Sequence, residues 1–394
     1  MSQTQAICSI IAKNYVAHAR ILAESFVSRH PGKRCFVLVI DDYEGYIDPS
    51  QEVFEVIGLH ELQIPNVRSF CFKYNVTELA TALKAAFLRF LIEERQVEQV
   101  LYLDPDILVM SGLDELFERL NRAPLLLTPH LDQDYPNDGR FPNDTSVLRA
   151  GIFNLGFLGL ASGAWATGFL QWLHEKLSDF CVVDPAGGYF VDQRFFDIAL
   201  ATFPEIEIER GVGYNVAYWN LHSRFLTLRD GTWWCNGELL RFFHFSNYRP
   251  EAPESISGHI NRYKMADRPD LAPLFDSYRS QLLSHGYEKA KTWPYTFSKF
   301  ANGTPISEPI RREYRNWIAS GQAMEDPFAS NELVGLSRKL VFKERVNDGL
   351  DRVLGRLWSL GGKLSRRSVS DSKASKPVAE NAAADLGIVT NKLP

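Results

Sequence analysis

The sequence has few cysteines, no long apolar run and no excess of basic residues. Its five cysteines are an odd number without C-x-x-C spacing, which predicts reduced, buried thiols rather than a disulfide framework or a cysteine zinc site. No stretch reaches the roughly 18 apolar residues of a transmembrane helix. The formal net charge of -5 argues against a nucleic-acid partner. With no secretory signal pattern at its start, the chain is expected to be cytoplasmic.

What the sequence does contain is the composition of a globular protein, 45% hydrophobic and 23% charged. We expect a domain over residues 1–250, a helical extension packed on it over 251–335, and a disordered tail over 368–394. Between them, residues 336–367 form a basic amphipathic segment. Its part 338–367 has nine Lys or Arg against three acids. This pattern predicts either peripheral contact with the anionic inner face of the cytoplasmic membrane or a helix packed on protein.

Strand and helix signals alternate along the first part of the chain. Continuous apolar strands that alternate with amphipathic helices predict an α/β fold with a mostly parallel sheet covered on both faces. Ligands of such sheets collect at the carboxyl ends of the strands. A loop rich in Asp, Pro, Asn and Gly at 129–143 is a candidate for a mobile cover. The expected strands are 6–12, 35–40, 100–103, 153–160 and 241–245, and the expected helices are 15–28, 78–94, 168–177 and 192–200.

The main chemical signal is the pair Asp104 and Asp106, separated by Pro105 at the end of the expected strand 100–103. Two carboxylates at that spacing can hold a hard divalent cation, which in turn can bridge a diphosphate. The same spacing recurs at Asp132 and Asp134, but that pair lies in a loop without strand residues on both sides. Context therefore favours the first pair as metal ligands over a structural turn.

A second signal is His244, which lies in the aromatic run 242–245 and needs a polar partner there. A lone histidine in such a run is more often a satisfied core residue. Together with the two aspartates, however, it is a candidate third metal ligand. Arg249 follows five residues later and is a candidate for neutralising a phosphate, or else a surface arginine.

In these landmarks the chain resembles GT-A-fold (Rossmann-like) glycosyltransferases related to glycosyltransferase family 8, and bacterial relatives of polysaccharide synthesis. The matching segments occur in the family's order, over about 60% of the chain. They are the first strand with Asn14-Tyr15; Leu83-Lys84 through Arg89 into the run 100–109; Phe153-Asn154-Leu155-Gly156; Asp192-Gln193; and His244-Phe245-Ser246-Asn247.

The resemblance implies a hexosyltransferase that moves a sugar from a nucleotide-sugar donor, a UDP-sugar being favoured, to a glycan or lipid-linked glycan acceptor with retention of configuration. It implies Mn²⁺ or Mg²⁺ bound by Asp104, Asp106 and His244. Asp104 also comes near the donor. The resemblance further implies that Ser9 to Tyr15 line the nucleotide pocket, with Tyr15 stacking on the base, and that Arg89 faces the donor. It places Asn154 at the transferred sugar, and Asp192 and Gln193 at the acceptor side and the anomeric face. Arg249 is a candidate substitute for a lysine of the family.

The sequence also departs from the family's pattern and leaves rivals open. The family has glycine where this chain has Asn247. The family's downstream lysine is absent from this chain at its usual spacing. A nucleotidyltransferase acting on sugar phosphates shares metal-binding carboxylates on a similar sheet, although it normally has a glycine-rich loop after the first strand, here Ala12-Lys13-Asn14-Tyr15. A metal-dependent hydrolase is less favoured still, because the sequence shows no second carboxylate–histidine cluster. A degenerate protein that binds nucleotide-sugars without catalysis is the non-enzymatic rival.

Overall fold

The computed structural model describes residues 4–322 and 324–340 of the chain. The chain divides into two compact units by its internal contacts. Unit 1 comprises residues 1–65 and 76–296, and unit 2 comprises residues 66–75 together with the chain from 297 onward. The sequence instead predicts a division of the chain after residue 250, with an extension packed on the first domain. That division stays a prediction. Most of the segment 336–367 and the whole of 368–394 lie outside the described residues.

Unit 1 is built on a seven-stranded sheet with the order β10-β6-β7-β4-β1-β2-β3. The β1–β2, β1–β4, β2–β3 and β6–β10 pairs are parallel, whereas β7 runs antiparallel to both β4 and β6. The strands of this sheet are β1 (Gln5–Ile11), β2 (Arg34–Val39), β3 (Glu55–Gly58), β4 (Gln99–Leu103), β6 (Leu125–Pro129), β7 (Phe153–Ala161) and β10 (Ile206–Ile208).

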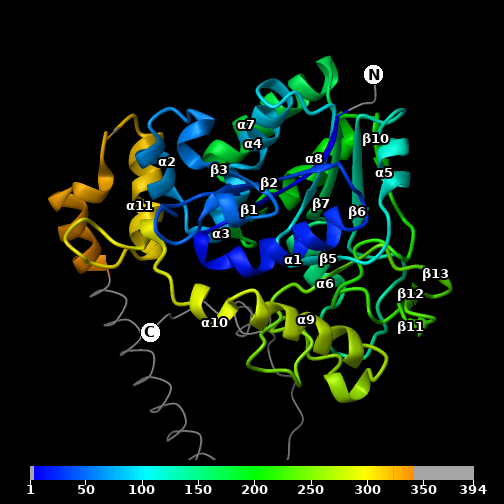
Figure 1. Cartoon of the computed structure of the whole chain (residues 1–394). Coiled ribbons are helices and arrows are strands. Elements are labelled where there is room, and N and C mark those ends of the chain that lie inside the picture. The colour runs from blue at the N-terminus through cyan, green and yellow to red at the C-terminus, as the bar shows by residue number, and fades with distance from the viewer. Residues whose placement is uncertain (1–3, 323, 341–394) are drawn as a thin grey trace, which may run out of the picture. The chain divides into compact units, whose positions relative to one another are not determined.

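Smaller sheets and the helices complete unit 1 (Figure 1). The remaining strands are β5 (Ile107–Val109), β8 (Val183–Asp184), β9 (Tyr189–Phe190), β11 (Leu226–Arg229), β12 (Thr232–Cys235), β13 (Glu238–Leu239) and β14 (Phe242–His244). The α-helices are α1 (Val16–Val27), α3 (Val76–Ala82), α4 (Lys84–Glu93), α5 (Asp114–Arg119), α6 (Asp144–Ala150), α7 (Ala164–Phe180), α8 (Gln193–Thr202), α9 (Ala272–Ser284) and α10 (Tyr287–Ala290). The 3-10 helices are η1 (Lys13–Tyr15), η2 (Pro49–Gln51), η3 (Leu59–Leu62) and η4 (Met265–Asp267), with η5 (Thr296–Ser298) at the boundary with unit 2.

The core of unit 1 is formed by the apolar faces of its helices and strands. The apolar stripe of α1, with Leu22 and Phe26, packs on residues of β1, β2 and β4 such as Ile7 and Leu101, together with Phe117 of α5. Helices α3, α4, α7 and α8 form the other helical layer, in which α8 packs on β7. Because both faces of the sheet are covered, strands β1, β2 and β4 are apolar almost throughout, as the sequence predicts for a buried sheet.

Unit 2 is a small helical cluster. Residues 66–75 supply α2 (Val67–Lys73), which packs with α11 (Glu308–Ala319) and η6 (Pro327–Ala329); a further helix spans 331–340. The ring of Phe72 lies 4.8 Å from Tyr314 and 5.0 Å from Phe328. The buried Arg311 guanidinium donates to the Phe72 carbonyl at 2.8 Å, so an arginine of α11 satisfies the carboxyl end of α2.

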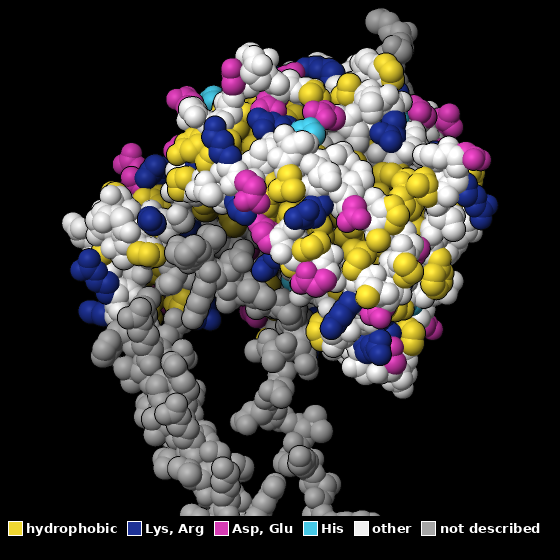
Figure 2. All heavy atoms as spheres, turned by 60° about the horizontal axis from the view of Figure 1, so that its bottom comes forward, with side chains coloured by type: hydrophobic (Ala, Val, Ile, Leu, Met, Phe, Trp, Pro, Cys, Tyr) yellow, Lys and Arg dark blue, Asp and Glu magenta, His cyan; other side chains and the backbone are white. Residues whose placement is uncertain are grey.

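The mixed α/β class and the mostly parallel central sheet expected from the sequence are confirmed. The expected strands and helices are found within a few residues, except that the helix expected over 78–94 is two helices that meet at Leu83. The run 125–129, for which no strand was expected, forms β6. Within residues 4–322 and 324–340, none of the helices is long and apolar enough to cross a bilayer. On the face shown in Figure 2, Lys and Arg lie interspersed with Asp and Glu.

Candidate active site

Asp104 and Asp106 lie in a tight turn that directly follows β4. The Ile107 amide donates to the Asp104 carbonyl at 3.1 Å, and Pro105 occupies the second position of this turn, where its fixed φ is favourable. The chain then reverses into β5. The turn therefore presents both carboxylates at the carboxyl end of a central strand, where parallel sheets bind ligands.

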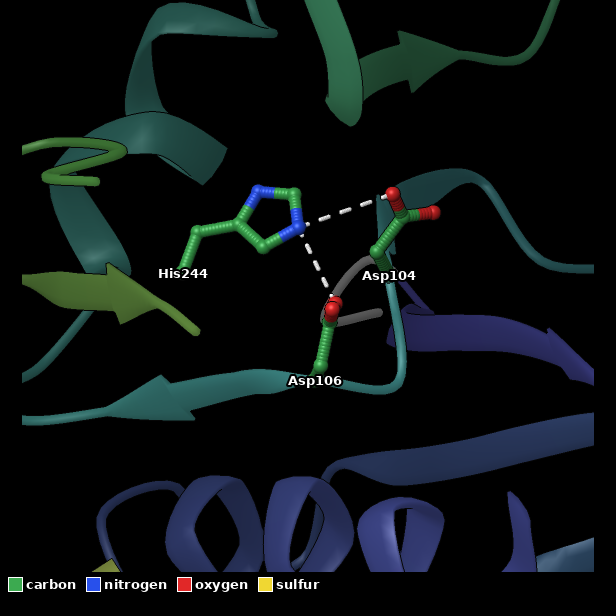
Figure 3. A group of neighbouring side chains, drawn as sticks. All are labelled: Asp104, Asp106 and His244. Carbon is green, nitrogen blue, oxygen red and sulfur yellow. Dashed lines mark ion pairs between the residues drawn. The ribbon is translucent and has the colours of Figure 1, made fainter. Parts of the chain in front are cut away.

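His244 reaches the aspartates because β14 pairs antiparallel with β5. In this register His244 is opposite Ile107, and the Phe245 amide donates to the Asp106 carbonyl at 2.9 Å. The His244 Nε2 atom lies 3.0 Å from Asp106 Oδ1 and 3.8 Å from Asp104 Oδ2, and Figure 3 shows the imidazole directed at both carboxylates. Backbone pairing thus joins residues that are 138 positions apart in the sequence.

The three titratable groups of this cluster shift one another's pKa. Burial raises the pKa of Asp104, although Lys84 and His244 oppose it. Burial acts in the same direction on Asp106, but there the charge and hydrogen bond of His244 outweigh it and hold the pKa below its ordinary value. For His244, burial would lower the pKa, yet the two aspartates raise it above the ordinary value.

His244 is also fixed from behind. Its Nδ1 atom lies 3.3 Å from Asn215 Oδ1, and the ring of Trp219 meets the imidazole edge-on at 5.1 Å between centroids. A proton on Nδ1, donated to Asn215, leaves the lone pair of Nε2 directed at the aspartates. Gly156 of β7 lies close to the ring as well, because a Cβ atom there would come within 2.4 Å of His244 Cε1.

The three side chains fit a divalent cation. One ligand atom from each of Asp104, Asp106 and His244 lies within 4.8 Å of the other two. Two carboxylate oxygens and one imidazole nitrogen are a suitable donor set for Mn²⁺, and the carboxylates also suit Mg²⁺. The Tyr102 hydroxyl donates to Asp104 Oδ1 at 2.7 Å, which orients that carboxylate. The residues present therefore make up a possible metal site, as the sequence predicted.

Next to this cluster lies a buried ion pair between Lys84 and Asp192. Lys84 Nζ lies 2.5 Å from Asp192 Oδ2 and donates to the Leu155 carbonyl at 2.9 Å. Its ammonium group also lies 4.3 Å from the centre of the Tyr102 ring. Burial raises the pKa of Asp192, and Lys84 opposes that shift. Lys84, to which no role was assigned from the sequence, is thus the cation of α4 whose charge reaches the cluster.

A chain of amide side chains links the acceptor-side candidates to the histidine. Asn154 Nδ2 donates to Gln193 Oε1 at 3.3 Å, and Asn215 Nδ2 donates to Asn154 Oδ1 at 3.0 Å. Asn215 in turn contacts His244 through its Oδ1. The structure therefore brings Asn154, Gln193 and His244 together through Asn215. That asparagine lies between elements without periodic signal, so nothing in the sequence marked it.

Tyr15 lies near Asp106 and Arg249. Burial and the charge of Asp106 raise the pKa of Tyr15 to about 12, while Arg249 opposes that shift. Tyr15 is 45% exposed as a residue, and its ring stacks on His18 with 4.6 Å between ring centroids. Burial lowers the pKa of His18 to about 4 against the charge of Asp106, so this imidazole is neutral.

Two other predicted residues lie differently. Ser9 is fully buried in β1, and its hydroxyl has no hydrogen-bond partner. Arg89 lies on the exposed face of α4, 3.8 Å from Glu93, roughly 140° around the helix from Lys84. The structure therefore does not bring Arg89 to the buried cluster.

The asparagine in place of the family's glycine keeps the backbone that a glycine would allow. Asn247 has a φ of 53°, in the left-handed region, where asparagine is tolerated better than most residues. Its side-chain Nδ2 lies 3.0 Å from His259 Nε2. The turn after His244 is thus compatible with the departure at this position.

The loop expected as a mobile cover is tied to its neighbours. The Tyr135 hydroxyl donates to the Trp219 carbonyl at 2.6 Å, and Arg262 binds Asp138 and donates to the Pro142 carbonyl at 3.1 Å. Trp219 itself contacts His244. The loop therefore helps to hold the residues behind the histidine.

The chain was also compared with known proteins. No protein-family model matches the chain. The uncharacterized protein YfnD of Bacillus subtilis (strain 168) is 25% identical over 246 residues, which are 61% of this chain and 76% of YfnD.

Solved structures of glycosyltransferases are similar to the chain in fold. The galactosyltransferase LgtC, in complex with donor and acceptor sugar analogs, has a TM-score of 0.43 and 15% identity, over 70% of this chain and 95% of LgtC. The glycosyltransferase GlyE in Streptococcus pneumoniae has the same TM-score and identity, over 76% of this chain and 67% of GlyE. At these TM-scores and identities, the resemblance to GT-A glycosyltransferases and the membership of family 8 both stay predictions.

Proposed function

We propose that this chain is a metal-dependent glycosyltransferase, which transfers a hexose from a nucleotide-sugar donor to a glycan or lipid-linked glycan acceptor. The observation that carries the proposal is the convergence of Asp104, Asp106 and His244 at the carboxyl end of β4. A divalent cation held there supplies positive charge for the diphosphate leaving group. The donor is favoured to be a UDP-sugar, and the metal Mn²⁺.

The chain's own residues then have distinct tasks. Asp104 and Asp106 hold the cation, and Asn215 and Tyr102 orient two of the three ligands. Arg249 is exposed near Tyr15, where its charge can face a phosphate. Neutralising the leaving group in this way lowers the barrier, since negative charge develops on the diphosphate as the glycosidic bond breaks.

On the acceptor side, the amides of Asn154 and Gln193 offer donors and acceptors for sugar hydroxyls, next to the buried pair Lys84–Asp192. Their mutual hydrogen bonds fix them before substrate binds, which reduces the reorganisation needed in the transition state. We propose that Asn154 contacts the transferred sugar and that Asp192 and Gln193 flank the reacting carbon. Retention of configuration is part of the proposal through the family resemblance.

The rival nucleotidyltransferase is less favoured because of Lys13. That lysine follows β1, where a phosphate-binding loop is expected, but its Nζ is buried and donates to Asp41 at 2.9 Å and to Thr296 at 3.2 Å. Both its charge and its hydrogen bonds are therefore engaged within the protein.

The role in bacterial surface polysaccharide synthesis, and peripheral contact with the membrane through 338–367, are parts of the same proposal. They rest on the resemblance and on the basic composition of that segment.

The function is tested with a panel of UDP-, GDP- and dTDP-sugars in the presence of Mn²⁺. We expect at least one donor to raise the melting temperature and to release its nucleotide, and both effects to disappear with a chelator. Asp106→Ala is expected to abolish both while the protein stays folded. Asp134→Ala is the matched control, since it alters the exposed member of the second Asp-x-Asp pair. If no donor protects the wild-type protein, it is not a nucleotide-sugar transferase.

A further inference from the structure

A two-ring stack stands at the start of α1, next to the proposed metal site. The ring of Tyr15 lies 4.6 Å from that of His18, with only 22° between the planes. His18 is 6% exposed, whereas Tyr15 is 45% exposed. One face of the tyrosine is therefore covered by a buried imidazole, while Tyr15 as a residue keeps nearly half of its exposure.

His18 is itself held firmly. The ring of Tyr287 in α10 meets it edge-on, with 5.7 Å between centroids and 71° between planes. Tyr287 contacts Glu251 through its hydroxyl at 3.3 Å. The imidazole of His18 is thus held by packing between Tyr287 and the more exposed Tyr15.

Hydrogen bonding at Nδ1 does not account for a histidine at this position. The Nδ1 atom of His18 is buried and has no hydrogen-bond partner. A buried polar atom of this kind costs stability, and such atoms are few in folded proteins. What the imidazole visibly contributes is a flat face against Tyr15. This face lies within the electrostatic range of Asp106, at the site where a nucleotide diphosphate is proposed to bind.

We propose that His18 is a positioning residue for the donor: its ring fixes Tyr15, the tyrosine that the family resemblance places against the nucleotide base. This inference rests on the proposed function and deepens it. Stacking on an aromatic ring accepts any base, because every base has a π-face. The Tyr15–His18 stack then provides affinity for the nucleoside part of the donor, while the Asp104 and Asp106 cluster provides affinity for the diphosphate.

The test compares ligands that differ only in the base. Binding of UDP, GDP and inorganic pyrophosphate is measured by calorimetry with Mn²⁺ present. We expect His18→Ala to weaken the binding of UDP and GDP by about tenfold, within the range for loss of one stacking contact. The affinity for pyrophosphate is expected to stay unchanged. His18→Phe retains a flat ring and is expected to keep the wild-type affinity. Should His18→Ala fail to fold, His18→Leu fills the same space without an aromatic face.

A double-mutant comparison separates positioning from a general structural role. In a Tyr15→Ala background, His18→Ala is expected to cause no further loss, because its effect passes through the tyrosine. His30 is the matched control: it is equally buried and stacks on Phe26 at 4.4 Å, outside the site. His30→Ala is expected to leave UDP binding unchanged.

The outcomes separate the two proposals. If the wild-type protein binds pyrophosphate but no nucleotide with Mn²⁺, the proposed function and this inference both fall. If it binds UDP and His18→Ala binds UDP equally well, only the role of His18 is overturned. The role of His18 is also overturned if His18→Ala loses as much affinity for pyrophosphate as for UDP. The same holds if His18→Ala still lowers the affinity for UDP in the Tyr15→Ala background.

Discussion

A methyl group at position 156 is expected to disable the metal site without altering a ligand. A Cβ atom on Gly156 would lie 2.4 Å from Cε1 and 2.8 Å from Nδ1 of His244, whereas ordinary contacts begin at 3.4 Å. The imidazole must therefore retreat by about 1 Å, which is far beyond the roughly 0.2 Å that metal–ligand distances tolerate. The same methyl lies 2.8 Å from Asn154 Oδ1, so Asn154 is displaced too.

The magnitude follows from that displacement. Disturbing the groups that orient a metal ligand weakens metal binding by about 10- to 100-fold, and we expect Gly156→Ala to lie in that range. Overpacking of this kind costs about 1–3 kcal/mol of stability, so the variant should remain folded. Backbone strain plays little part, because the φ of Gly156 is not in the left-handed region.

Mn²⁺ titration by calorimetry provides the assay, with thermal unfolding recorded in parallel. Gly159→Ala is the control in the same strand. The nearest atoms to its Cβ would be Leu101 Cδ2 at 3.2 Å, Leu126 Cβ at 3.3 Å and Leu126 Cδ1 at 3.5 Å, none of them a metal-site atom. We expect that variant to bind Mn²⁺ normally. Wild-type Mn²⁺ affinity in folded Gly156→Ala would refute the placement of His244 as a ligand.

Three further predictions concern the buried charges and the tail. Lys84→Met leaves Asp192 buried without its partner, so the free energy of unfolding in urea should fall by about 3–5 kcal/mol, and adding Asp192→Asn should restore most of it; an unchanged unfolding curve would contradict the ion pair. The raised pKa of His244 means that a proton competes with the metal, so Mn²⁺ affinity measured by calorimetry should fall as the pH is lowered through that pKa; a pH-independent affinity would exclude His244 as a ligand. A chain that ends at Val334 should bind anionic liposomes more weakly in a sedimentation assay, and equal binding would remove the membrane role of 338–367.

Local patterns were sufficient for the class of fold and for the first half of the site. Apolar strands alternating with amphipathic helices predicted a mostly parallel sheet, because side-chain period and burial are encoded within a few residues. The position of Asp104 and Asp106 after a buried strand predicted that they lie at its carboxyl end, where such sheets bind ligands. From the sequence, a structural turn was only the alternative to metal binding, whereas the chain forms a turn through Pro105 that presents both carboxylates.

Only the tertiary structure decided which distant side chains join them. The β5–β14 pairing places His244 against Asp106, and sequence-local rules do not specify which strands pair across more than a hundred residues. The same holds for Asn215, which reaches His244 from a segment without regular structure. On α4, the break at Leu83 sets the helix phase, so Lys84 faces the interior and Arg89 faces solvent. Periodicity gives the faces of a helix, but packing decides which face is buried and what it meets there.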